Sequence, residues 1–140
     1  MKPRKLSMPF WCVGNPVGDP FGPAVMDRLS SLEVCDILCR ARSEHLIEYT
    51  AAHDDDLVAW DPQHLEDDLD PASPASATLR TLKERLDAAE LPLIMVTCGL
   101  HGNPVFRNGG LANPNPEIRL LAARKVMRTI RIGNRLGAQY

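Results

Sequence analysis

Aromatic side chains are scarce here, since Phe, Trp and Tyr make up only 5% of the 140 residues. Long apolar runs are also missing, and none approaches the roughly 20 residues that a helix needs to cross a bilayer. The opening stretch MKPRKLSMPF has no apolar signal-peptide core. We therefore expect a cytosolic protein with reduced thiols and no membrane partner.

Common catalytic motifs are missing as well. There is no G-x-x-x-x-G-K-[ST] loop for ATP, no G-x-S-x-G and no H-E-x-x-H. The four cysteines form no C-x-x-C pair. Cys35 and Cys39 fall on an apolar helix stripe, where free cysteine behaves as a small hydrophobe. A zinc site or thiol nucleophile built from these cysteines and His101 is an alternative that the spacing does not favour.

The remaining metal-type side chains have simpler interpretations. Asp54, Asp55 and Asp56 could bind a hard cation, but a solvated acidic turn is the more usual outcome. His45, His53 and His64 lie in or beside helical or acidic stretches and need no role beyond the surface. We expect no catalytic residue, no metal, no cofactor and no enzymatic activity.

Charge is distributed unevenly along the chain. Residues 44–90 hold thirteen acidic and three basic side chains, whereas residues 119–140 hold six basic and no acidic ones. An acidic middle and a basic end suggest an anionic partner, or pairing of these regions within the chain or between copies.

Three helices are predicted from apolar spacing and caps. Ser30 and Glu33 have capping-box spacing before an amphipathic pattern over 31–53. Ser73 and Pro74 open a second helix that ends near residue 90. Asn115 and Pro116 open a third, which should run to about residue 132, with Gly133 just past its end.

A short hairpin is predicted before the last helix. LIMVTC, residues 93–98, suits a strand, and residues 105–107 could return beside it. The Asn-Pro and Gly-Gly pairs within residues 103–116 close this hairpin and fix the first residue of the helix. The predicted fold is mainly α with a short β-hairpin, an α+β class. An extended arm, 1–28, precedes one helical domain, 29–140, with an acidic loop at 54–72.

The last helix carries the strongest charge pattern. On a helical wheel four arginines fall in one stripe, opposite an apolar face that includes Ala122, Met127 and Ile130. Such a row of guanidinium groups could bind phosphate, because arginine donates two parallel hydrogen bonds to it. The row could instead pair with the acidic loop. We predict DNA or inter-subunit contacts for Arg119, Arg124, Lys125, Arg128, Arg131 and Arg135. Weaker DNA-binding candidates are Lys2, Arg4, Lys5 and Arg28.

The order of these parts resembles a known family. CDILCRARSEHLIEY, the turn GLHGNPV and the helix NPEIRLLAARKVMRTIRIGNRLG together look like the small terminase subunits of tailed bacteriophages. The residues that carry the likeness lie mainly at 93–137. Its structural motif comprises Gly102, Asn103, Pro104, Asn115 and Pro116.

The resemblance implies a regulatory role in viral genome packaging. Such proteins form ring-type homo-oligomers, bind double-stranded viral DNA and recruit a terminase large subunit that is the ATPase and nuclease. The segment 93–137 would then serve oligomerisation, in the cytoplasm of an infected bacterial host. The first alternative is a small phage or bacterial protein-interaction module that does not bind DNA, and the second is an enzyme using the cysteine and histidine set.

Overall fold

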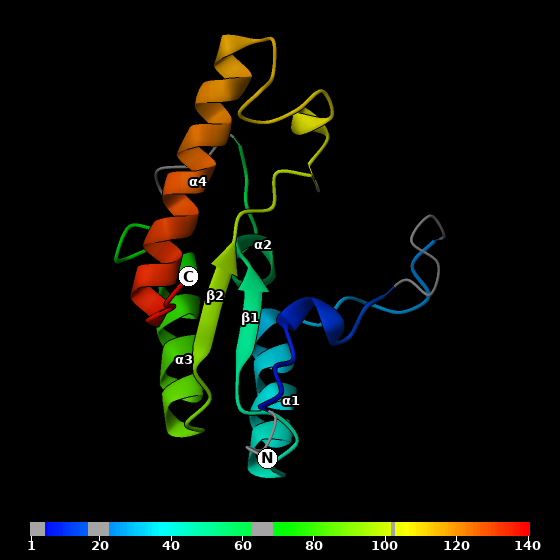
Figure 1. Cartoon of the computed structure of the whole chain (residues 1–140), viewed down its shortest axis with the longest axis vertical. Helices are drawn as coiled ribbons and strands as arrows, with labels where there is room; N and C mark the ends of the chain where they lie inside the picture. The colour runs from blue at the N-terminus through cyan, green and yellow to red at the C-terminus, as the bar shows by residue number, and fades with distance from the viewer. Residues whose placement is uncertain (1–4, 17–22, 63–68, 102) are drawn as a thin grey trace.

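The structure is a computed structural model of the chain, and it describes residues 5–16, 23–62, 69–101 and 103–140. Four helices are described: α1 (Ser31–Ser43), α2 (Asp54–Leu57), α3 (Pro74–Ala88) and α4 (Pro116–Leu136). Two strands, β1 (Thr50–His53) and β2 (Leu93–Thr97), lie in front of α1 and α3 in Figure 1. Short 3-10 turns occupy Phe10–Cys12 and Pro104–Phe106. The fold is therefore mixed α/β.

The sheet is parallel, so the predicted hairpin is wrong. β1 pairs with β2 with Ala52 opposite Val96 and His53 opposite Thr97. The expected return strand is instead a 3-10 turn that Asn103 caps by accepting a hydrogen bond from the N–H of Val105. Asn103 and Pro104 do form a turn, as their residue types predict, but this turn begins a 3-10 helix and does not close a hairpin.

Both edges of this sheet carry a further parallel segment. Ser7 forms a parallel bridge with Tyr49, just before β1. On the other side, the N–H of Tyr140 donates to the carbonyl of Ile94, and the N–H of Val96 donates to the carbonyl of Tyr140. That pair of bonds is the pattern of a parallel ladder. The strand order across the sheet therefore follows the chain: segment 6–8, β1, β2, segment 139–140.

Caps explain where the helices begin. Ser30 forms the predicted capping box with Glu33, Ser73 accepts from the N–H of Ser76, and Asn115 accepts from the N–H of Glu117. All three predicted starts are confirmed because each rests on short-range hydrogen bonds.

Two predicted helix ends are wrong. α1 stops at Ser43 instead of residue 53, and His45 follows with a φ of 58°. The residues from Thr50 on are drawn into the sheet, which overrides their helical spacing. α4 runs past Gly133, which packs against Val96, and ends before Gly137 in the left-handed conformation.

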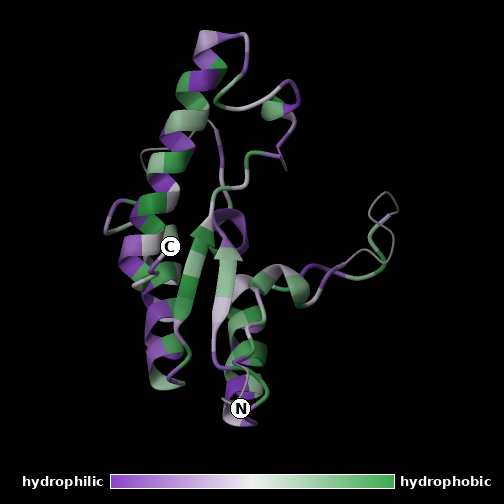
Figure 2. Cartoon of the chain, viewed as in Figure 1, coloured by the Kyte–Doolittle hydropathy of each residue, from purple (hydrophilic) through white to green (hydrophobic). Residues whose placement is uncertain are grey.

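The core lies between the sheet and the helices. Figure 2 shows apolar residues on the strands and on the helix faces turned toward them. Leu38 of α1, Leu82 of α3 and Ile132 of α4 are fully buried in one cluster that also includes Ala52 and Leu93. This packing fixes the two strands side by side, so their carboxyl ends lie at one level.

The remaining predictions concern membrane spans, oligomeric state and domain boundaries. Within the described ranges, no helix is both long and apolar enough to span a membrane. The ring-type oligomer is not shown by the single chain. The division into an arm, 1–28, and a helical domain, 29–140, stays a prediction.

Candidate functional site at the strand ends

Aromatic and polar side chains meet where β1 and β2 end. The ring of His53, the last residue of β1, stacks on Trp11 with a centroid distance of 4.4 Å and an interplanar angle of 26°. His101 meets the same imidazole edge-on at 5.7 Å. Thr97, the last residue of β2, lies 2.5 Å from Nδ1 of His53 through its Oγ1. We call Trp11, His53, Thr97 and His101 the strand-end site.

The direction of the contact between Thr97 and His53 depends on the tautomer of the imidazole. The hydroxyl of Thr97 also points to the carbonyl of Ala52, at 3.5 Å, and a carbonyl can only accept. If the hydroxyl donates to that carbonyl, it must accept from Nδ1–H of His53. Nε2 is then left as the acceptor nitrogen, which is the form of histidine that can take a proton from a bound hydroxyl.

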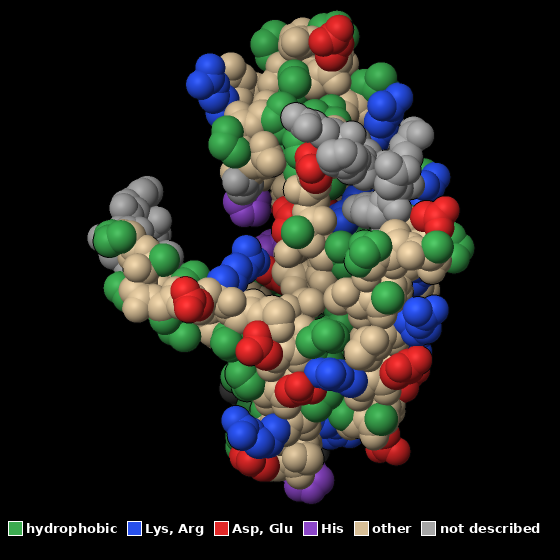
Figure 3. Space-filling view, turned by 180° about the vertical axis from the view of Figure 1, so that it is seen from behind, with side chains coloured by type: hydrophobic (Ala, Val, Ile, Leu, Met, Phe, Trp, Pro, Cys, Tyr) green, Lys and Arg blue, Asp and Glu red, His purple; other side chains and the backbone are tan. Residues whose placement is uncertain are grey.

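A cavity of about 280 Å³ lies beside Trp11. Arg28 and Asp56 border it, and their side chains lie 3.5 Å apart. Asp56 also accepts a hydrogen bond from the backbone N–H of His53, at 2.9 Å. Figure 3 shows histidine, basic and acidic side chains beside the notch between the protruding N-terminal segment and the body. The site therefore combines aromatic faces with hydrogen-bonding groups.

A buried charged cluster lies directly behind the strand-end site. Asp54 and Lys125 have no exposed side-chain surface, and Nζ of Lys125 lies 2.5 Å from Oδ2 of Asp54. The other oxygen of Asp54 accepts from the N–H of Gly99, and Thr129 donates to Oδ2. Nη1 of Arg128 lies 3.5 Å from the same oxygen. Buried charges are tolerated only when paired and hydrogen-bonded in this way.

Aromatic rings and a second carboxylate complete this cluster. Asp55 accepts from Nζ of Lys125 at 2.9 Å, and the Trp60 ring lies 4.9 Å from the same nitrogen. Trp60 in turn stacks on Phe106. Burial raises the pKa of Asp55, although its hydrogen bond from Lys125 opposes that rise.

The cluster fixes the geometry of the strand-end site. Asp54 follows His53 directly, and Gly99 lies two residues after Thr97. One carboxylate therefore holds the ends of both strands together and anchors them to α4 through Lys125. Such support keeps functional side chains in a fixed orientation.

The predicted arginine stripe of α4 is divided by the structure. Arg128 is buried and donates to the carbonyls of Val58 and Ala59, whereas Arg135 bonds Ser76. Lys125 lies in the charged cluster. Arg119, Arg124, Arg131 and Arg135 are exposed. Inter-subunit contacts of these exposed arginines stay a prediction.

The predicted apolar face of α4 is partly wrong. Met127 and Ile130 are half-exposed, while Lys125 and Arg128 point inward with Ala122. The wheel placed apolar residues inside and charges outside. In the folded chain Asp54 brings a carboxylate under the helix and draws two cations inward.

The other predicted site residues lie apart from one another. Lys5 donates to the hydroxyl of Tyr49, and Arg28 pairs with Asp56. Asn103 and Pro104 form the 3-10 turn, and Asn115 and Pro116 begin α4. Lys2, Arg4 and Gly102 lie outside the described residues.

Three of the four cysteines lie in surroundings that disfavour the reactive thiolate. Burial raises the pKa of Cys35 to about 12 and also raises the pKa of Cys39 and of Cys98. A nucleophilic or metal-binding cysteine needs the opposite shift. In the parts of the chain that the structure describes, no three His, Cys, Asp or Glu side chains are grouped to hold a metal.

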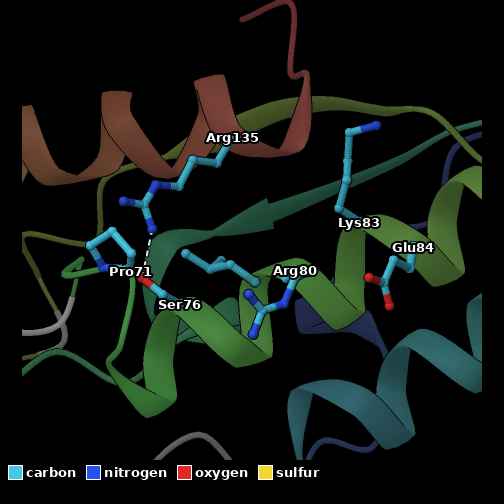
Figure 4. Close-up of a pocket in the computed structure, with 7 residues that line it drawn as sticks. Pro71, Ser76, Arg80, Lys83, Glu84 and Arg135 are labelled. Atoms are coloured by element: carbon cyan, nitrogen blue, oxygen red, sulfur yellow. Dashed lines mark hydrogen bonds between the residues drawn. The ribbon is translucent and has the colours of Figure 1, made fainter.

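A second cavity, of about 370 Å³, lies between α3 and the end of α4 (Figure 4). Arg135 donates to Oγ of Ser76 across it, at 2.7 Å, and Arg80, Lys83 and Glu84 lie along α3. The charged side chains that border this cavity, Arg80, Lys83, Glu84 and Arg135, lie at the surface, and none of them is buried. The strand-end site is therefore the better candidate.

Sequence reasoning missed most of the strand-end site. His53 was assigned to the surface and Thr97 only to a strand, and Trp11 was not among the candidate site residues. The long helix predicted over 31–53 hid the strand, and therefore hid that His53 ends it. A strand end followed by Asp54 would have been the signal, because ligands bind at the carboxyl ends of parallel strands.

Comparison with known proteins gives a different relationship from the terminases. No protein-family model matches the chain. It is similar to the xylose isomerase of Thermus thermophilus, with 32% identity over 136 residues that cover 97% of this chain and 32% of the relative. The xylose isomerase of Thermus caldophilus is 33% identical over the same length. The chain thus spans about a third of the length of these curated relatives.

These relatives overturn the functional predictions. Both are named as sugar isomerases, so the resemblance to terminase small subunits is wrong, as is the expectation of a protein without enzymatic function. Nothing in the relatives indicates viral DNA or a terminase large subunit as a partner, and the DNA-free interaction module gains no support either. The short turn motifs misled because Gly, Asn and Pro recur wherever helices and turns begin.

Proposed function

We propose that the chain forms part of a sugar isomerase and that the strand-end site binds the sugar. The observation that carries this proposal is the similarity to xylose isomerases over 97% of the chain, including the strand ends that hold His53 and Thr97. The location agrees with it, because parallel α/β sheets bind ligands beyond the carboxyl ends of their strands.

The side chains of the site suit a small polyhydroxylated ligand. Trp11 is 38% exposed and presents an aromatic face that can pack against the C–H surface of a sugar ring. Nε2 of His53 can accept a proton from a sugar hydroxyl when Nδ1 carries the ring hydrogen. Converting an aldose to a ketose moves one hydrogen from C2 to C1 and one proton from the C2 hydroxyl to the C1 oxygen, without net oxidation. A side chain that accepts and returns a hydroxyl proton can serve the second of these transfers.

The experiment that tests the proposal is binding of D-xylose followed by NMR. The ring proton signals of Trp11, His53 and His101 should shift with increasing D-xylose and saturate. His53→Gln should weaken this binding by about tenfold, which corresponds to about 1.4 kcal/mol for loss of one hydrogen bond to the sugar. Ethylene glycol at the same hydroxyl concentration should leave the signals in place.

His45→Asn is the matched control. His45 is exposed, lies before β1 at the opposite end of the strand, and has a positive φ that asparagine tolerates. This variant should bind D-xylose as the parent does. If D-xylose shifts none of the three ring signals, or if His53→Gln binds unchanged, the strand-end site is not the sugar site.

A further inference from the structure

We propose that the cavity between α3 and the end of α4 binds a small amphipathic anion, which carries one carboxylate or phosphate group on an apolar body about the size of a benzene ring. We call it the α3–α4 cavity, and its volume is about 370 Å³ (Figure 4). The proposal is independent of the sugar chemistry, because none of the four residues of the strand-end site borders this cavity.

Part of the cavity wall is apolar. Leu79 is 2% exposed and belongs to the core cluster, so it presents a fixed surface. Pro71 adds a rigid ring, and the hydrocarbon stems of Arg80 and Lys83 extend the same wall. Ligand pockets in proteins commonly have volumes of about 300–1,000 Å³, so this cavity admits a small molecule with an apolar part.

Arg135 brings a fixed positive charge to the cavity. Its Nη1 donates to Oγ of Ser76 at 2.7 Å, and its Nη2 donates to the carbonyl of Leu69 at 2.5 Å. Ser76 is only 7% exposed, so a buried partner holds the guanidinium in place. Both acceptors are uncharged and use two of the five N–H donors of arginine. The charge and the other donors are therefore available to a ligand.

Arg80 brings a second cation to the same cavity. It lies one turn after Ser76 on α3 and is exposed. Figure 4 shows Arg135 reaching across from α4 to α3, where Arg80 follows Ser76 along the helix. Among the residues that the structure describes, neither arginine forms an ion pair with a carboxylate.

The other charged groups at the cavity do not cancel these two. Lys83 pairs with Asp87, and Glu84 lies at the opposite end of the cavity from Arg135 in Figure 4. The excess positive charge is therefore concentrated around Arg135 and Arg80. Guanidinium groups donate two parallel hydrogen bonds to a carboxylate or a phosphate, which makes an oxyanion the matching ligand group.

The test is a titration of the full chain with benzoate and with phenyl phosphate, followed by NMR of the backbone amides. Signals of residues 76–84 and of Arg135 should shift and saturate with a dissociation constant of about 1 mM or lower, the ordinary range for so small a ligand. The tighter of the two anions identifies the preferred group. Benzyl alcohol lacks the charge and inorganic phosphate lacks the apolar body, so each should bind at least about tenfold more weakly.

Two variants remove the cations one at a time. Arg80→Gln and Arg135→Gln should each raise the dissociation constant about tenfold, because each removes a hydrogen bond between charged groups. In the described part of the chain Arg80 makes no side-chain hydrogen bond, so Arg80→Gln should fold as the parent does. Arg40→Gln is the matched control, since Arg40 is exposed on α1 and does not border the cavity. It should bind both anions unchanged.

Three results would overturn the proposal. One is that neither anion shifts the signals of residues 76–84 at concentrations up to about 10 mM. Another is that Arg80→Gln, shown to be folded by circular dichroism, binds both anions as tightly as the parent does. The third is that the shifts fall on Trp11 and His53, which would place the anions in the strand-end site.

Discussion

Helices α3 and α4 each hold a lysine 2.5 Å from an aspartate, yet the surroundings of the two pairs are opposite. Lys83 and Asp87 lie one turn apart on α3, with 38% and 62% of their side chains exposed. Lys125 of α4 and Asp54 of α2 are 71 residues apart and completely buried. The same two residue types at the same distance therefore play different parts in the two helices.

Burial decides what each pair contributes. Water screens the exposed pair, so its net free energy is close to zero. The buried pair interacts in a medium of low dielectric, and removal of one partner leaves a buried charge without its closest counter-ion. Apolar residues such as Leu82 hold α3 in place, whereas α4 combines its buried Ile132 with the charged contact of Lys125 to Asp54 at the strand ends.

The most direct way to break the comparison is Lys125→Met. Methionine fills a similar volume but leaves Asp54 with the hydrogen bonds from Thr129 and Gly99 and with the more distant cation Arg128, at 3.5 Å. We expect the free energy of unfolding to fall by about 4 kcal/mol, since breaking buried pairs costs roughly 3–5 kcal/mol. Urea denaturation followed by circular dichroism measures it.

A second variant separates loss of charge from loss of packing. In Asp54→Asn/Lys125→Met the amide still accepts from the N–H of Gly99, and no buried charge is left over at residue 54. We expect this double variant to recover about 1–2 kcal/mol relative to Lys125→Met. Equal stability of the single and double variants would show that packing alone explains the cost.

Leu82→Ala tests what holds α3. Leu82 is fully buried in the core cluster, and truncation of a buried leucine removes packing and leaves a cavity. We expect a loss of about 3 kcal/mol in the free energy of unfolding, measured in urea, within the range of about 2–5 kcal/mol for such changes.

Leu120→Ala on α4 is the matched control, because Leu120 is 55% exposed. It should change the free energy of unfolding by less than about 0.5 kcal/mol. If both leucine variants lost the same free energy, the exposed face of α4 would have to be covered in solution.

The same contrast explains which parts of the fold could be predicted from the sequence. Ser30, Ser73 and Asn115 were placed correctly as caps because they act within three residues of themselves. The buried face of α3 was also predicted, since its leucines recur at helical spacing. Local hydrogen bonds and apolar periodicity are visible in one segment of sequence.

Long-range contacts were not visible in this way. The Asp54–Lys125 pair joins residues that no local pattern relates, so the acidic run was taken as a solvated turn and Lys125 as a DNA-binding or inter-subunit residue. β1 was missed because its pairing with β2 depends on residues more than forty positions away. The strand-end site depends on both contacts, and therefore most of it was missed.

Ser30→Ala should have a smaller effect, on α1. The side chain of Ser30 accepts from the N–H of Glu33, and its own N–H donates to the carboxylate of Glu33. We expect a loss of about 1 kcal/mol in the free energy of unfolding, the usual contribution of an N-cap. Ser43→Ala, at the exposed end of α1, is the control and should lose less.

The capping box also predicts a dependence on pH. Hydrogen bonds from Ser30 lower the pKa of Glu33 below its ordinary value of 4.5. A carboxylate with a lowered pKa stabilises the folded state above pH 4.5, and this contribution is lost as the pH falls through the lowered value. Ser30→Ala should raise the pKa of Glu33 in an NMR titration, and an unchanged pKa would contradict the hydrogen-bond assignment.

Lys83→Met should have the smallest effect, although it is the same substitution as Lys125→Met and removes a contact of the same length. Asp87 stays in water, so loss of its partner leaves no buried charge, and methionine is as good a helix former as lysine. We expect the free energy of unfolding to change by less than about 0.5 kcal/mol in urea, and by less still at high salt. A loss of several kcal/mol would mean that Lys83 has a partner in solution beyond Asp87. The comparison of Lys83 with Lys125 would then have to include contacts between chains as well as burial within one chain.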